Sequence, residues 1–134
     1  MSPLPVRTYG ITHIALAVKD VKRARKFYAD VFGMVAVYED PNFIQMQTPG
    51  SRDVLVFEKS TATTGKSAGV KHFGFRLIDP GDIGEAAKAI EAGGGTITDK
   101  GEFIPGEPYI FFRDPDGYDV EVWYEIPTKV DPKS

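Results

Sequence analysis

The feature that most constrains this chain is an internal duplication of a strand-helix-strand-strand-strand pattern. The segment Gly10-Ile11-Thr12-His13 is echoed by Gly69-Val70-Lys71-His72, and each opens a stretch in which apolar residues alternate with small or polar ones. Asp53-Val54-Leu55-Val56-Phe57 is echoed in turn by Asp119-Val120-Glu121-Val122-Trp123. Alternation of this kind is typical of strands with one buried face. The sequence therefore predicts two copies of a small open sheet, packed against one another or across a dimer.

The first repeat is expected at residues 9–59 and the second at 69–125, within one domain that spans 9–125. In the first strand, alternation places His13, Ala15 and Ala17 opposite the larger Ile14, Leu16 and Val18. Asp20 is suited to cap a helix over Val21–Phe32, and Gly33 is suited to end it. The further strands are expected at 34–39, 43–48 and 53–58.

The second repeat is expected to contain a strand at 69–78, a helix at 82–92, and strands at 96–98, 109–113 and 119–125. The segment Asp114-Pro115-Asp116-Gly117 predicts a tight turn, because Pro115 presets φ, Asp114 can accept bonds from the turn backbone and Gly117 tolerates positive φ. A Ser/Thr/Gly/Lys-rich linker is expected at 60–68, and tails are expected at 1–8 and 126–134.

Composition excludes several classes of function. The net charge is −3 and the basic residues form no stripe, so nucleic acid is not expected as a partner. Cysteine is absent, which excludes disulfides, thiol catalysis and cysteine-bound metals. No apolar run approaches the length of a membrane-spanning helix. We expect a soluble, cytoplasmic protein that has no membrane partner.

Three side chains stand out as candidate metal ligands. The chain has only two histidines, His13 and His72, at matching positions in the two repeats. Glu121 is a carboxylate between two valines on the last strand, where burial is costly without a partner or a metal. Two imidazoles and one carboxylate suit a divalent first-row metal and leave coordination positions open. The alternative is a His–Glu ion-pair cluster without metal.

The chain resembles the vicinal oxygen chelate superfamily, which includes glyoxalase I, extradiol dioxygenases and the metal-free bleomycin-binding proteins. The resemblance covers residues 9–125 and is carried by four motifs: Ile11-Thr12-His13-Ile14-Ala15-Leu16-Ala17-Val18-Lys19-Asp20, Phe27-Tyr28-Ala29-Asp30-Val31-Phe32-Gly33-Met34, His72-Phe73-Gly74-Phe75 and Asp114-Pro115-Asp116-Gly117-Tyr118-Asp119-Val120-Glu121. It implies an α+β fold of two tandem βαβββ repeats that form a curved mixed sheet around a metal and ligand cavity.

The resemblance also implies that His13, His72 and Glu121 hold a divalent metal, which Fe, Ni, Zn, Co and Mn all fit. It implies a homodimer, in which the site lies within one chain or is shared between two. Many members carry a fourth ligand on the last strand of the first repeat. The internal alignment places Leu55 there and a one-residue slip places Val56, and neither can ligate. In the slipped register, Glu58 would share the inward face.

The missing fourth ligand breaks the strict pattern of glyoxalase I. The mechanism common to the superfamily still implies a glyoxalase-like lyase or isomerase that chelates vicinal substrate oxygens. The first alternative is an Fe(II) extradiol-type dioxygenase, although such enzymes resemble one another in a tyrosine where this chain has Phe111. The second is a metal-free small-molecule (drug) binding protein. The candidate catalytic bases are Glu121 and Glu58.

An aromatic substrate pocket is expected at Phe57, Tyr109, Phe111 and Trp123, unless these rings are core. Arg76 shares the face of His72 and is a candidate to bind a substrate carboxylate, with a surface salt bridge as the alternative. The loop at 101–108, rich in glycine and proline, is expected to border the mouth of this pocket.

Overall fold

The structure is a computed structural model that describes residues 7, 9–60, 64–66 and 69–132. The chain divides into two compact units, Met1–Thr64 and Gly65–Ser134. Parts of the expected linker and tails, namely 1–6, 8, 61–63, 67–68 and 133–134, lie outside the described residues.

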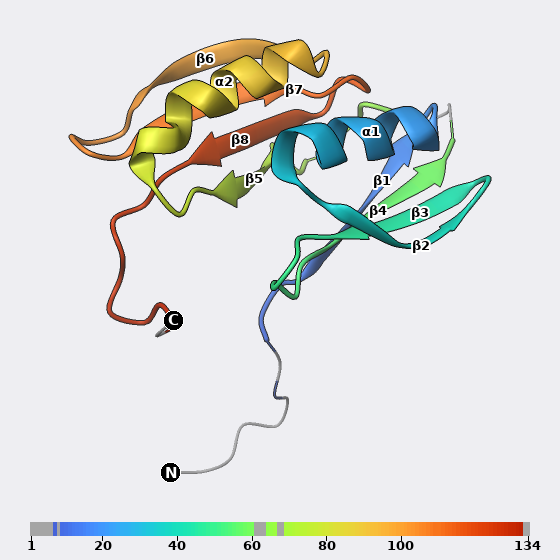
Figure 1. The fold of residues 1–134 in the computed structure, drawn as a ribbon, viewed down its shortest axis with the longest axis horizontal. Coiled ribbons are helices and arrows are strands. Elements are labelled where there is room, and N and C mark those ends of the chain that lie inside the picture. Colours follow the sequence, from blue (N-terminus) through green and yellow to red (C-terminus); the bar gives the residue numbers. More distant parts are fainter. Residues whose placement is uncertain (1–6, 8, 61–63, 67–68, 133–134) are drawn as a thin grey trace. The chain divides into compact units, whose positions relative to one another are not determined.

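The first unit is a four-stranded sheet with one helix on it (Figure 1). Its elements are β1 (His13–Val18), α1 (Val21–Phe32), β2 (Val35–Asp40), β3 (Phe43–Gln47) and β4 (Val54–Lys59). The strand order is β1-β4-β3-β2. Strand β1 pairs with β4 in parallel, whereas the other pairs are antiparallel. The parallel pair is possible because α1 and two further strands separate β1 from β4 along the chain.

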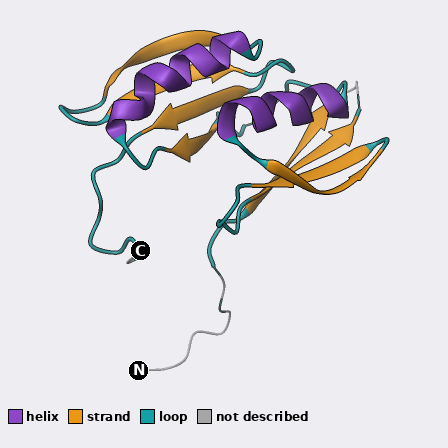
Figure 2. Cartoon of the chain, in the orientation of Figure 1, coloured by secondary structure: helices purple, strands orange, loops and turns teal. Residues whose placement is uncertain are grey.

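The second unit repeats this arrangement. Its elements are β5 (Phe73–Arg76), a short 3-10 turn η1 (Pro80–Asp82), α2 (Ile83–Ala92), β6 (Thr96–Glu102), β7 (Pro108–Arg113) and β8 (Asp119–Trp123). The strand order is β5-β8-β7-β6, again with one parallel pair, β5 with β8. In each unit the helix covers one face of its own sheet (Figure 2). The predicted α+β class with two tandem βαβββ repeats is confirmed.

Helix α1 begins and ends where its sequence predicts. The Asp20 Oδ1 atom accepts hydrogen bonds from the backbone N–H groups of Lys22 at 3.0 Å and Arg23 at 3.1 Å. Gly33 follows the last turn with φ of 69°, a left-handed conformation that glycine adopts without steric cost. Among the described residues, we find no helix with the length and apolar character that a bilayer crossing requires.

The tight turn before β8 is held by one buried carboxylate. The Asp114 Oδ1 atom accepts hydrogen bonds from the Asp116 N–H at 2.9 Å and the Tyr118 N–H at 3.0 Å. Gly117 takes a φ of 94°, as expected for this turn. The turn sets the start of β8 and thereby fixes which of its residues face the helix.

Two strands of the second unit differ most from their predicted bounds. Strand β5 begins at Phe73, so His72 lies one residue before it and not inside a strand from 69 to 78. Strand β6 continues to Glu102, well beyond the short segment expected at 96–98. Its pairing with β7 is interrupted by an irregularity between Ile97 and Asp99. Residues 99–102 are a glycine and charged residues, which have low β propensity. The sequence pattern therefore did not predict that the strand continues through them.

The core of the first unit lies between α1 and its sheet, and Phe57 belongs to it. The Phe57 side chain is fully buried, and its ring centroid lies 5.4 Å from that of Tyr28 on α1. We expected Phe57 in the substrate pocket, but alternation along β4 turns it toward the helix and away from the face of His13.

The C-terminal segment, expected as a tail, is attached to the second unit by contacts of Asp131. Arg76 donates to both carboxylate oxygens of Asp131, at 3.0 and 2.7 Å, and lies 3.4 Å from the Glu125 carboxylate. Asp131 also accepts from the N–H and hydroxyl of Thr128. The hydrogen bond from Arg76 is the main reason that the pKa of Asp131 lies well below its ordinary value.

We predict that Phe57→Ala lowers the free energy of unfolding by about 3–5 kcal/mol, because truncation of a buried ring leaves a cavity. Urea unfolding followed by circular dichroism measures this change. Val37→Ala, in half-exposed surface of the same unit, is the matched control and is expected to cost less than about 1 kcal/mol. Equal effects of the two substitutions would contradict the assignment of Phe57 to the core.

We predict that Asp131→Asn reduces the hydrogen-exchange protection of the Thr128 amide at neutral pH, because it weakens the attachment to Arg76. The Asp131 pKa is lower in the folded protein than its ordinary value of about 3.9. The attachment is therefore complete above that pH and is lost as the pH falls through the lower folded-state pKa. Equal protection in wild type and variant at neutral pH would contradict this prediction.

Candidate functional site

The second unit brings two of the three predicted metal ligands together. Glu121 lies in the middle of β8, opposite Gly74 on β5 and Phe111 on β7. The His72 Nε2 atom lies 3.7 Å from the Glu121 Oε1 atom. Burial raises the pKa of the Glu121 carboxyl, and the neighbouring His72 opposes that shift. An imidazole and a partly desolvated carboxylate therefore converge at one place on the open face of the sheet.

The residue beside this pair has to be very small. A Cβ atom at Gly74 would lie 2.8 Å from the backbone oxygen of Glu121 and 3.3 Å from its Cβ. Real side chains essentially never accept the shorter of these contacts, so any other residue would push β5 away from β8. The glycine thus allows the spacing that places the Glu121 carboxylate beside His72.

A continuous group of aromatic rings extends from this pair across the open face. The His72 and Phe111 ring centroids are 5.0 Å apart, and those of Phe111 and Tyr109 are 5.5 Å apart. Phe103 stacks on Tyr109 at 4.3 Å and meets Trp123 edge-on at 6.2 Å. The predicted pocket residues Tyr109, Phe111 and Trp123 therefore share one surface with His72 and Glu121.

The Tyr109 hydroxyl is fixed and neutral. It donates a hydrogen bond to Asp99 Oδ2 at 3.1 Å. Desolvation, followed by this hydrogen bond, raises the pKa of Tyr109 above its ordinary value of 10.0. The tyrosine therefore presents its ring to the open face and its hydroxyl to strand β6.

Arg76 is engaged by the C-terminal segment. It donates to both carboxylate oxygens of Asp131 and also lies near the Glu125 carboxylate. These contacts form the surface salt bridge that was the predicted alternative to binding of a substrate carboxylate. Arg113, which also lies on the open face, is 3.4 Å from the carboxylate of Asp119. The two arginines of this face thus have carboxylate partners within the chain.

The first unit carries His13 on its own open face, in a pocket of about 420 Å³. The pocket is lined by Thr12, His13, Ala15, Phe43, Gln45, Val54, Val56 and Glu58. Within the described residues, the Glu58 side chain has no hydrogen bond or ion pair. An imidazole and an exposed carboxylate therefore share one pocket wall.

The strand register decides which residue of the first repeat matches Glu121. Ala15 pairs with Val56 in the first unit as Gly74 pairs with Glu121 in the second. The match is therefore Val56, and the alignment that placed Leu55 there is one residue off. Leu55 is buried beneath the helix. The slipped register places Glu58 on the face of His13.

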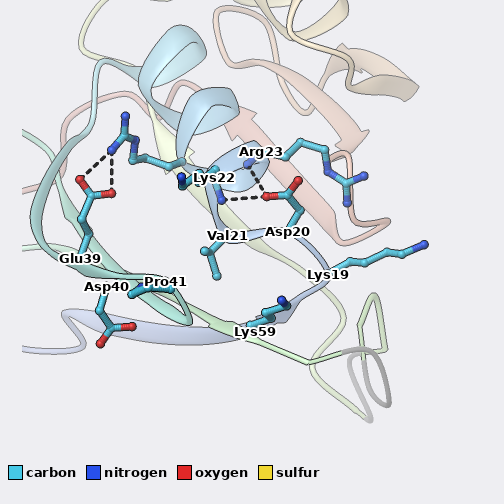
Figure 3. Close-up of a pocket in the computed structure, with 10 residues that line it drawn as sticks. Lys19, Asp20, Val21, Lys22, Arg23, Glu39, Asp40, Pro41 and Lys59 are labelled. Atoms are coloured by element: carbon cyan, nitrogen blue, oxygen red, sulfur yellow. Dashed lines mark hydrogen bonds and ion pairs between the residues drawn. The ribbon is translucent and has the colours of Figure 1, made fainter.

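A larger cleft, of about 950 Å³, lies at the N-terminal end of α1 (Figure 3). Its lining is rich in charged residues, and Arg25 within it donates to both carboxylate oxygens of Glu39. Asp20, which caps the helix, already accepts hydrogen bonds from the N–H groups of Lys22 and Arg23. The cleft contains no histidine, and we assign it no chemistry.

The donor set fits a divalent metal in type. Imidazole nitrogen and carboxylate oxygen are the ligands that such ions prefer, and His72 with Glu121 supplies one of each. His13 belongs to the other unit. Across the described residues, no group of three or more histidine, aspartate or glutamate side chains is assembled for a metal. The structure thus brings together one pair of predicted ligands and leaves the third a prediction.

Two residues of this surface were missed by reasoning from the sequence. Phe103 lies in the loop after β6, where no alternation assigns it to a face, and Asp99 follows the irregularity in β6. The glycine and proline content of 101–108 had indicated only that the loop borders the site. Contact with Tyr109 is what identifies both residues.

Comparison with known proteins finds relatives that are named as enzymes. The chain is 30% identical over 122 residues to a protein from Vibrio parahaemolyticus that is named probable lactoylglutathione lyase. The matched region covers 84% of this chain and 88% of the relative. It is 27% identical to a manganese-dependent 2,3-dihydroxybiphenyl 1,2-dioxygenase from Geobacillus genomosp. 3, over 85% of this chain but 36% of that protein.

Among solved structures, the fosfomycin resistance protein FosX from Listeria monocytogenes has the same fold. The TM-score is 0.75 at 19% identity, over 90% of this chain and 96% of that one. A family model matches residues 10–122, which include both repeats. The chain therefore belongs to the Glyoxalase/Bleomycin resistance protein/Dioxygenase superfamily, the vicinal oxygen chelate proteins.

Proposed function

We propose that this protein is a metal-dependent enzyme, a glyoxalase-like lyase or isomerase that acts on a small molecule with two adjacent oxygens. Membership of the superfamily supports this proposal, as does the relative named as a probable lactoylglutathione lyase. The single observation that carries it is the approach of His72 Nε2 to Glu121 Oε1 at 3.7 Å. A carboxylate in so apolar a strand is costly unless it serves as a ligand or a hydrogen-bond acceptor.

In this proposal His72 and Glu121 hold the metal, and His13 is the third ligand, from the same chain or from a second copy. Fe, Ni, Zn, Co and Mn all suit nitrogen and oxygen donors of this kind. A structure of FosX from Listeria monocytogenes in complex with Mn(II) adds support for a divalent ion. When bound, such an ion supplies a Lewis acid for adjacent substrate oxygens.

The chain's own residues supply the other functions. Glu58 is the proposed proton acceptor, because it shares a pocket with His13 and is exposed without a partner among the described residues. Glu121 is the other candidate base. The rings of Tyr109, Phe111 and Trp123 exclude water from one side of the substrate. The homodimer and the cytoplasmic location stay predictions.

A second candidate is an extradiol-type dioxygenase. The relative named as a manganese-dependent 2,3-dihydroxybiphenyl 1,2-dioxygenase favours it, as does the ring-lined face. Phe111, where the tyrosine of such enzymes is expected, weakens it. Oxygen uptake by the metal-loaded protein separates the two candidates, because a lyase or isomerase consumes none. A metal-free binding protein is the third possibility, in which His72 and Glu121 form only an ion pair.

We predict that purified protein retains close to one divalent metal ion per site and that Glu121→Gln and His72→Ala each lower the affinity at least about tenfold. Glu121→Gln removes the charge of the carboxylate ligand, and His72→Ala removes the imidazole ligand. Metal analysis and metal titration by calorimetry measure this. Asp119→Asn is the matched control, because Asp119 lies on the same strand and face but pairs with Arg113.

If wild type binds no divalent metal, or if Glu121→Gln and Asp119→Asn bind it equally well, the metal-dependent function is excluded. The metal-free binding protein would then be favoured. His13→Ala extends the test to the third ligand, and its effect on metal affinity is expected to match that of His72→Ala.

A further inference from the structure

We infer, on the basis of the proposed function, that the substrate carries a planar, uncharged ring and that Phe103 is a specificity-determining residue for it. In this inference the ring lies on the aromatic surface of the second unit, defined as Phe103, Tyr109, Phe111 and Trp123. The substrate oxygens lie toward His72 and Glu121.

The aromatic surface and the proposed ligand pair are contiguous. Phe111 lies opposite Glu121 in the strand pairing and contacts His72 edge-on. Tyr109 lies opposite Trp123, one pleat further along the same two strands. A substrate whose oxygens reach His72 and Glu121 and whose body extends toward β7 therefore lies along these rings. Rings bind planar rings in offset or edge-on geometry, which favours a ring over an aliphatic chain.

Phe103 is held in place despite its exposure. Phe103 is 50% exposed, so its ring is accessible to a ligand. Its N–H donates to the Glu107 carbonyl at 3.1 Å, and the Glu107 N–H donates to the Ile104 carbonyl at 2.9 Å. Glu102 accepts from the Gly106 N–H at 2.9 Å. The loop is thus closed by its own hydrogen bonds, and the ring is positioned before any ligand arrives.

The charges beside the rings disfavour an anionic group on the ring of the substrate. Arg76 and Arg113 each have a carboxylate partner within the chain, so neither is offered unpaired to a ligand. Asp99, the hydrogen-bond partner of Tyr109, adds negative charge beside the rings. A carboxylate or phosphonate on the ring of the substrate would have to displace an internal partner of an arginine or lie beside Asp99. An uncharged ring neither competes with these internal ion pairs nor is repelled by a neighbouring carboxylate.

The chain contains a single tryptophan, Trp123, so its fluorescence reports on this surface alone. The experiment titrates metal-loaded protein with three probes that each carry two adjacent oxygens. Catechol is a neutral ring, propane-1,2-diol is neutral without a ring, and lactate is an anion without a ring. We expect catechol to bind at least about tenfold more tightly than either aliphatic probe.

The variants test the role of Phe103. Phe103→Ala and Phe103→Leu are both expected to weaken catechol binding about three- to tenfold, because each removes the ring contact. Ile104→Ala is the matched control, since Ile104 is 52% exposed in the same loop, and it should leave the affinity within about twofold. Circular dichroism verifies that the three variants fold alike, which is expected for half-exposed loop positions.

The outcomes separate this inference from the proposed function, because metal content is measured on the same samples. Lactate binding as tightly as catechol, or equal affinities for Phe103→Ala and Ile104→Ala, overturns the ring inference. Normal metal content would then leave the metal-dependent function standing. Catechol binding that depends on Phe103 in protein that retains no metal would support the ring surface and exclude the metal-dependent function.

Discussion

The close approach of β5 and β8 is the constraint on which the rest of the site depends. Gly74 lies directly beside Glu121, and a side chain at that position would meet the backbone of β8. Because the two strands are parallel neighbours, this spacing also fixes His72, one residue before β5, within 3.7 Å of the Glu121 carboxylate. A partly buried carboxylate beside an imidazole is the result, and the proposed metal chemistry builds on it.

The two faces of each sheet serve different purposes. One face packs against a helix and supplies stability, as Phe57 does beneath α1. The other face is open and carries the residues with chemistry: His13 and Glu58 in the first unit, His72 and Glu121 in the second. Alternation along a strand separates these roles at no cost, because neighbouring residues point in opposite directions. Substitutions on the open face can therefore alter ligand binding while the core stays intact.

Internal pairing of charge shapes what the second unit can recognise. Arg76 is bound by Asp131 from the C-terminal segment, and Arg113 lies beside Asp119. With these cations paired, the distinctive features of the face are its rings and the His72–Glu121 pair. Because one fold can host many functions, the architecture that this chain shares with FosX does not by itself fix the reaction.

The sequence by itself determined the duplicated fold, helix α1 with its cap at Asp20, the turn at Asp114 and the faces of the first strands. These features rest on local rules of capping, turn geometry and alternation. Tertiary structure alone decided the register that matches Val56 to Glu121, the burial of Phe57, the place of Phe103 among the rings and the pairing of Arg76 with Asp131. A one-residue shift in strand pairing moves every side chain to the opposite face, and only the hydrogen-bonded partner strand fixes it.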